Sequence, residues 1–161
     1  MGADGRTSVL LIEHNPNIVR TFHKLFSMIE KLATCEDAKT AADALGMMRI
    51  SRPDMVLVEQ SLPDIDGIKF TEMIRQEFPE IQVVLISQEK QYDIVLSAMR
   101  NGAFDFLTYD VSLEELTEVV KRGGELAESE RKRLQPYVYE PAQPATITRA
   151  AQGNIVAVYS P

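Results

Sequence analysis

Five short apolar runs, each followed by a segment with helical periodicity, constrain the fold of this chain most strongly. The runs comprise residues 8–12, 32–35, 55–58, 81–86 and 104–107. Between them, apolar residues recur at spacings of three and four, which predicts amphipathic helices near residues 16–29, 38–48, 68–78, 91–101 and 112–127. Strands that alternate with helices predict an α/β fold in which a five-stranded parallel sheet is doubly wound, in (βα)5 order.

Cap and turn residues place the ends of several predicted helices. Asn15 is expected to cap the first helix, with Pro16 in its first turn. Ser112 is expected to cap the fifth helix. Gly123 and Gly124 are poor helix formers, so we expect them to kink or end that helix.

Composition and charge narrow the classes of function. The 161 residues carry a formal net charge of −7, which disfavours direct binding to a nucleic-acid backbone. No stretch approaches the roughly 20 consecutive apolar residues of a membrane span. Cys35 is the single cysteine, so neither a disulfide nor a cysteine metal cluster is expected. These features predict a cytoplasmic protein.

Polar side chains follow four of the five apolar runs. They are Glu13 with His14, Glu59, Ser87 and Tyr109. In a parallel sheet of this kind the functional site lies beyond the carboxyl ends of the strands. The sequence therefore predicts that these residues line one site.

Three segments together resemble the CheY-like receiver domains of response regulators, which have a flavodoxin-like fold. The strongest is Val56-Leu-Val-Glu-Gln-Ser-Leu-Pro-Asp-Ile-Asp-Gly67, which is similar to the receiver strand with its phosphoacceptor and its Pro-x-x-x-Gly turn. The second is Asn101-Gly-Ala-Phe-Asp-Phe-Leu107, and the third runs from Val9 to Pro16. The resemblance extends over about Thr7 to Lys132 and implies a role in two-component signal transduction, or phosphorelay.

The resemblance also shows where this chain departs from the receiver pattern. Two acidic residues that help to hold Mg²⁺ in the family correspond here to Glu13 and His14, and the phosphoacceptor aspartate corresponds to Glu59. The receiver lysine corresponds to Tyr109. The hydroxyl after the fourth strand is kept as Ser87, and the switch aromatic is kept as Phe106; Ser61 completes the altered phosphoacceptor pocket.

These substitutions predict a receiver that has lost phosphorylation. Phosphoryl transfer needs a metal and a cation that take up the charge of the phosphoryl group. An imidazole at position 14 is a poor ligand for Mg²⁺, and a phenol at position 109 cannot replace an ammonium. The Glu59 carboxylate also stands roughly 1.5 Å farther from the backbone than an aspartate would. We therefore expect no catalytic residue, no enzyme activity, no cofactor and no bound metal.

Two of these residues have more than one interpretation. Glu59 either stands in for the phosphorylated state or is a solvated carboxylate in a vestigial pocket, and the second is favoured because one charge lacks the three oxygens of a phosphate. His14 is either a protonated counter-ion to Glu13 and Glu59 or part of a transition-metal site. The absence of further His or Cys in the pattern disfavours the metal. Ser87 is expected to hydrogen-bond the loop rather than to act as a nucleophile.

In receivers, the face built from the fourth helix, fifth strand and fifth helix commonly mediates dimerisation or output. The resemblance therefore implies a homodimer or a protein partner that binds this face, without phosphorylation. Tyr92 and Tyr109 are expected to be exposed and are candidate anchors, although both are equally compatible with ordinary surface residues. Two alternatives remain: a phosphorylatable receiver that uses Glu59, Asp64 or Asp66, and a flavin binder. The flavin binder is disfavoured because no Ser, Thr and Gly run follows Ile12.

The chain changes character near its C-terminus. We expect a receiver-like domain over residues 1–133, a linker rich in Pro and Ala over 134–152, and a strand over 153–161. The last segment, Gln152-Gly-Asn-Ile-Val-Ala-Val-Tyr-Ser-Pro161, resembles the strand that opens ParA/MinD-type ATPases. A receiver joined to such an ATPase resembles the CpaE/TadZ family, which implies a role in positioning Tad/Flp pilus-assembly machinery at a cell pole.

Overall fold

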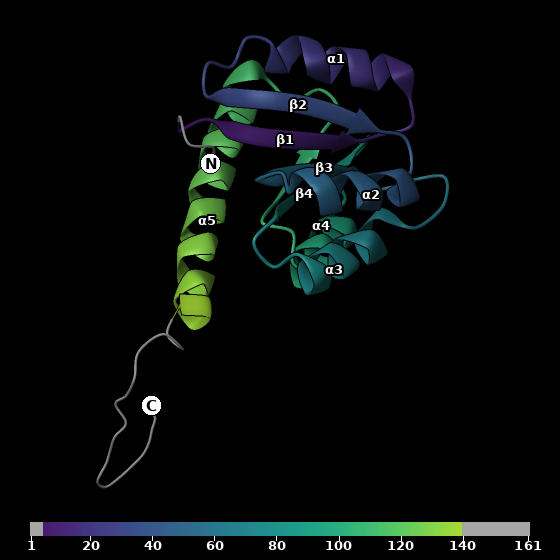
Figure 1. Cartoon of the computed structure of the whole chain (residues 1–161). Helices are drawn as coiled ribbons and strands as arrows, with labels where there is room; N and C mark the ends of the chain where they lie inside the picture. The colour runs from purple at the N-terminus through teal and green to yellow at the C-terminus, as the bar shows by residue number, and fades with distance from the viewer. Residues whose placement is uncertain (1–4, 140–161) are drawn as a thin grey trace, which may run out of the picture. The chain divides into compact units, whose positions relative to one another are not determined.

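The computed structural model describes residues 5–139, with side chains described as far as Leu134. Over this range, strands and helices alternate along the chain (Figure 1). The strands are β1 (Thr7–Ile12), β2 (Leu32–Ala38), β3 (Met55–Glu59), β4 (Gln82–Ser87) and β5 (Asp105–Thr108). The helices are α1 (Pro16–Phe26), α2 (Ala41–Ser51), α3 (Gly67–Glu77), α4 (Tyr92–Arg100) and α5 (Leu113–Tyr139). None of these helices is long and apolar enough to cross a bilayer.

All paired strands run parallel, in the order β2-β1-β3-β4-β5. The chain therefore starts near the middle of the sheet, builds outward to β2, and then crosses over to build β3, β4 and β5. This arrangement confirms the predicted doubly wound α/β fold. It also brings the carboxyl ends of β1 and β3 side by side, because Ile12 pairs with Val58.

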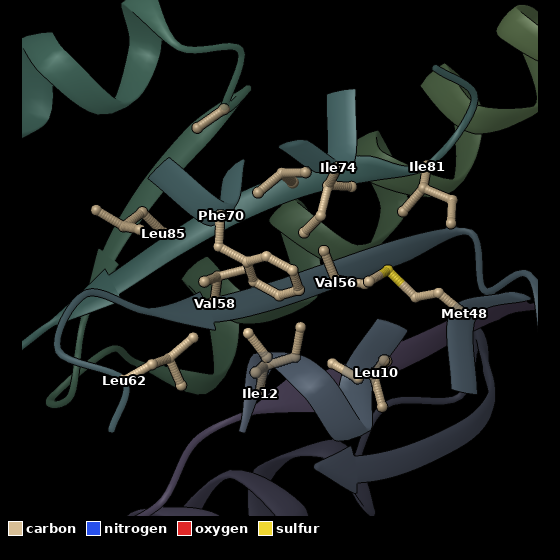
Figure 2. Close-up of a cluster of buried hydrophobic side chains, with 14 of the residues drawn as sticks. Leu10, Ile12, Met48, Val56, Val58, Leu62, Phe70, Ile74, Ile81 and Leu85 are labelled. Carbon is tan, nitrogen blue, oxygen red and sulfur yellow. The ribbon is translucent and has the colours of Figure 1, made fainter. Parts of the chain in front are cut away.

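Alternate side chains of the central strands feed two hydrophobic cores, one on each face of the sheet. Leu10, Val56, Val58 and their neighbours point to the α2, α3 and α4 side, where they meet buried residues such as Phe70 (Figure 2). The alternate set packs against α1 and α5 and includes Val9, Leu11, Leu57, Val84, Phe22, Phe26, Leu116 and Val120. Because each central strand is covered on both faces, its sequence lacks polar alternation.

Local capping determines where the helices begin. The Asn15 Oδ1 accepts a hydrogen bond from the Asn17 amide at 2.9 Å, and Pro16 is the first residue of α1, as predicted. Ser112 caps α5, since its Oγ accepts from the Glu115 amide at 3.1 Å. Thr40 caps α2 in the same way.

Two expectations about element boundaries were wrong. Ala38 is not on the second helix; it ends β2, pairs with Ile12 and is buried. Gly123 and Gly124 do not end α5, which continues to Tyr139. Gly123 instead permits close packing, because a Cβ there would lie 2.6 Å from the Met55 Sδ. The first six residues of the predicted linker, 134–139, lie within α5.

The remaining C-terminal expectations fall outside the described residues. These are the rest of the linker, residues 140–152, and the strand over 153–161. By internal contacts, one compact unit ends at Glu130 and a second begins at Arg131.

Candidate functional site

A hollow of about 340 Å³ lies at the carboxyl ends of β1, β3, β4 and β5. The structure brings together in it all six residues of the predicted pocket: Glu13, His14, Glu59, Ser61, Ser87 and Tyr109. Five further residues that the sequence reasoning did not assign to the pocket complete the lining: Asn15, Gln60, Gln88, Glu89 and Gln91. The topology alone explains the convergence, because the strand order sets these four strand ends next to one another.

The carboxylate of Glu59 is held by His14. Its Oε2 accepts a hydrogen bond from the His14 backbone N–H at 2.9 Å, and the two carboxylate oxygens lie 2.7 and 2.8 Å from the imidazole Nδ1. Glu59 is 2% exposed, whereas the side chain of His14 is half exposed. Glu59 is therefore not a solvated carboxylate, and that expectation was wrong. The contact has the geometry of the counter-ion interpretation: hydrogen bonding to Glu59 raises the pKa of His14, while burial opposes the rise.

Glu13 contributes a second carboxylate, which is fully buried. Its Oε2 accepts from the Asn15 amide at 3.1 Å and lies 3.8 Å from the His14 Nδ1. Its Oε1 is buried and has no hydrogen-bond partner among the described residues. Burial raises the pKa of Glu13 to about 7; the Asn15 hydrogen bond opposes this rise and the charge of Glu59 adds to it. Glu13 is thus poised between its charged and neutral forms near neutral pH.

Tyr109 directly follows β5 and lines the hollow. Burial and the nearby charges of Glu13 and Glu59 raise the pKa of its phenol, so the hydroxyl stays neutral. Tyr109 is partly buried and packs against the α1/α5 core, so the expectation that it is exposed was wrong. Tyr92, at the start of α4, is 77% exposed. Phe106 is buried in the α2/α3/α4 core.

Ser87 is engaged with the loop that follows β3. Its Oγ donates a hydrogen bond to the Gln60 Oε1 at 2.7 Å, and the Gln60 amide donates to the Ile86 carbonyl at 2.9 Å. This confirms the expectation that Ser87 hydrogen-bonds the loop. Gln60 is a site residue that the sequence reasoning missed, and its position directly after Glu59 was the only signal that could have found it.

Asp64 and Asp66 lie outside the hollow and are used as caps. The Asp64 carboxylate accepts from the Ala41 and Ala42 amides at the start of α2, at 3.1 Å each. Although burial alone would raise the pKa of Asp64, these two hydrogen bonds lower it. The Asp66 Oδ1 accepts from the Ile68 and Lys69 amides at the start of α3. Neither aspartate is among the residues that line the hollow, which disfavours their use as phosphoacceptors.

Comparison with known proteins identifies the family. Residues 9–121 match the response regulator receiver domain family. This chain belongs to that family. The receiver domain is 25% identical over 114 residues to "Probable C4-dicarboxylate response regulator DctR" of Bacillus subtilis strain 168, covering 71% of this chain and 50% of that protein. It is 26% identical over 113 residues to the transcriptional regulatory protein MctR of Rhizobium johnstonii, covering 70% and 53%.

A solved structure supports the same fold for the receiver domain. The signal receiver domain of an HD domain-containing protein from Pseudomonas fluorescens Pf-5 superposes with a TM-score of 0.75 at 24% identity, covering 83% of this chain and 98% of that one. The match to single receiver domains is thus nearly complete. The chain spans about half the length of the curated relatives named above.

The Mg²⁺ of receiver domains does not fit the side chains of this hollow. Mg²⁺ requires oxygen ligands in near-octahedral array. Here one ligand position is the imidazole of His14, which occupies both oxygens of Glu59.

Proposed function

We propose that this receiver domain acts without phosphorylation, as a non-enzymatic, cytoplasmic protein-binding module of a signalling protein. One observation carries the proposal: the Glu59 carboxylate is already engaged by the amide and imidazole of His14. A carboxylate that is buried and hydrogen-bonded in this way is not presented to an incoming phosphodonor.

The charge of the hollow supports the same conclusion. No Lys or Arg is among its lining residues, whereas three glutamates are: Glu13, Glu59 and Glu89. A phosphoryl group with nearly two negative charges would meet these carboxylates without an ammonium to offset them. His14 is the one side chain of the lining that can become cationic, and Glu59 already uses it.

Partner binding is proposed for the face formed by α4, β5 and the start of α5. Tyr92 is a large apolar residue of α4 that remains 77% exposed, and such side chains are common anchors of interface cores. A homodimer or a protein of the polar pilus machinery are the proposed partners. The homodimer is proposed because receivers commonly dimerise through this face. The pilus machinery is proposed because residues 152–161 resemble the strand that opens ParA/MinD-type ATPases.

Phosphorylation is tested with acetyl phosphate and with beryllofluoride, each in the presence of Mg²⁺. For the natural chain we expect no added mass and no change in melting temperature. The triple variant His14→Asp, Glu59→Asp, Tyr109→Lys restores the receiver residues at three positions and should gain both responses. Stoichiometric labelling of Glu59 in the natural chain would overturn the proposal.

The interaction face is tested by analytical ultracentrifugation over a range of concentrations. If the chain self-associates through this face, Tyr92→Ala should weaken the association by at least about tenfold, as expected for an aromatic anchor. Ile50→Ala is the matched control, because Ile50 is 88% exposed on α2. Equal weakening by both variants would refute the assignment of the face.

A further inference from the structure

Glu13, His14 and Glu59 form a compact set of nitrogen and oxygen donors that the interaction role does not use. One ligand atom from each side chain can be chosen so that all three atoms lie within 4.8 Å of one another. Glu13 and His14 follow β1 and Glu59 ends β3, so two paired strands fix the spacing of the set. A donor set fixed by sheet pairing is more rigid than one carried on loops alone.

The buried Oε1 of Glu13 points to a ligand independently of this clustering. The Glu13 side chain is fully buried, lines the hollow, and has one oxygen with no hydrogen-bond partner among the described residues. Leaving a polar atom buried without a partner costs about 1–3 kcal/mol. A cation bound beside this oxygen would remove that cost.

The chemistry of the donors selects the class of cation. Imidazole nitrogen together with carboxylate oxygen suits borderline first-row ions such as Zn²⁺, whereas Mg²⁺ prefers oxygen alone. Three protein ligands leave a fourth tetrahedral position for water, and the hollow of about 340 Å³ has room for it. The half-exposed ring of His14 gives the ion a route from solvent.

We propose that Glu13, His14 and Glu59 bind a borderline first-row divalent cation, for which Zn²⁺ is the probe, in preference to Mg²⁺. The ion takes the place of the proton between the His14 Nδ1 and the Glu59 carboxylate, and that proton is released to solvent. The charge of the ion offsets both carboxylates in the ligand set. Cation binding is measured without a partner and partner binding without added cation, so failure of one proposal is distinguishable from failure of the other.

Calorimetric titration of the untagged, chelator-treated chain with Zn²⁺ tests the proposal. We expect one Zn²⁺ per chain, and we expect a hundredfold excess of Mg²⁺ to leave the binding unchanged. His14→Ala should weaken binding by at least about tenfold, because mutating even a residue that only hydrogen-bonds a metal ligand typically lowers metal affinity by that factor. His23→Ala is the matched control, because the chain has only two histidines and His23 pairs with Asp37 instead.

A second variant guards against loss of the fold. His14→Asn keeps a polar side chain at this half-exposed position, and circular dichroism checks that both variants are folded. When Co²⁺ is bound in place of Zn²⁺, its visible absorption spectrum reports which types of ligand surround the ion. The proposal is overturned by absence of Zn²⁺ binding, or by His14 variants that bind Zn²⁺ as tightly as the natural chain. It is also overturned by loss of binding in His23→Ala, by a thiolate band from Cys35, or by displacement with Mg²⁺.

Discussion

Replacing Gly67 by Ala should destabilise the fold and displace Glu59. Gly67 is the first residue of α3, and its amide donates to the Gln60 carbonyl at 2.8 Å. A Cβ at position 67 would lie 2.2 Å from the Glu59 carbonyl oxygen and 2.8 Å from the Gln60 Cα. Both are backbone atoms, so a rotamer change cannot relieve the overlap, and the chain must move by about 1 Å to restore van der Waals contact.

The expected cost follows from these contacts. Overpacking of this kind costs about 1–3 kcal/mol, and weakening the Gly67–Gln60 hydrogen bond adds about 1 kcal/mol. The better helix propensity of Ala returns at most about 1 kcal/mol. We therefore expect the free energy of unfolding to fall by roughly 1–4 kcal/mol. Because the overlap is with Glu59 itself, the shift should also alter the contact between Glu59 and His14.

Gly46→Ala is the matched control, because it makes the same chemical change inside α2 with no atom within 4 Å of the new Cβ. This variant should gain about 0.5–1 kcal/mol from helix propensity alone. Urea unfolding followed by circular dichroism measures both changes, and the His14 ring resonances report on the site. The reasoning is refuted if Gly67→Ala is as stable as the natural chain, or if Gly46→Ala loses as much stability.

Two other predictions concern the carboxylates. Asp64→Ala removes the acceptor for the Ala41 and Ala42 amides, so urea unfolding should show a loss of about 1 kcal/mol, whereas exposed Glu72→Ala on α3 should change little. In buffer with chelator, the stability of the natural chain should fall as pH rises from about 4.5 to 7, because Glu13 ionises at its ordinary value of 4.5 when unfolded but only at about 7 when folded. The free energy of unfolding should fall by about 3 kcal/mol, and the raised pKa of His14 acts in the same direction. Glu13→Gln should remove most of this pH dependence, whereas Glu72→Gln should leave it unchanged. If all three proteins showed parallel pH profiles, the assignment to Glu13 would be wrong.

The sequence was sufficient to predict the fold and six of the eleven residues that line the site, for the same physical reason. Apolar runs without polar alternation indicate strands covered on both faces, and parallel strands bring the residues that follow them to one edge of the sheet. Glu13, Glu59, Ser87 and Tyr109 could therefore be grouped before any coordinates were known. Their membership depends on chain topology, which the hydrophobic pattern specifies strongly.

The directions of the side chains could not be predicted in this way. Whether Glu59 reaches solvent or turns to His14 depends on rotamers and on a backbone amide 45 residues away in sequence. The same holds for Asp64, which looks like a turn residue and in fact caps a helix 22 and 23 residues earlier. The role of Gly123 was predicted wrongly because a side chain there would collide with Met55, and helix propensity carries no information about such a tertiary contact.

β5 is the last strand of the sheet and hydrogen-bonds to β4 alone among the described strands. Within it, Phe106 enters one core and Leu107 the other, while Tyr109 follows at the rim of the hollow. A partner that bound the free edge of β5 and shifted the strand along β4 would therefore disturb both hydrophobic cores and the carboxylates of the hollow together. Binding at this free edge would in that way reach the hollow through the four residues of β5.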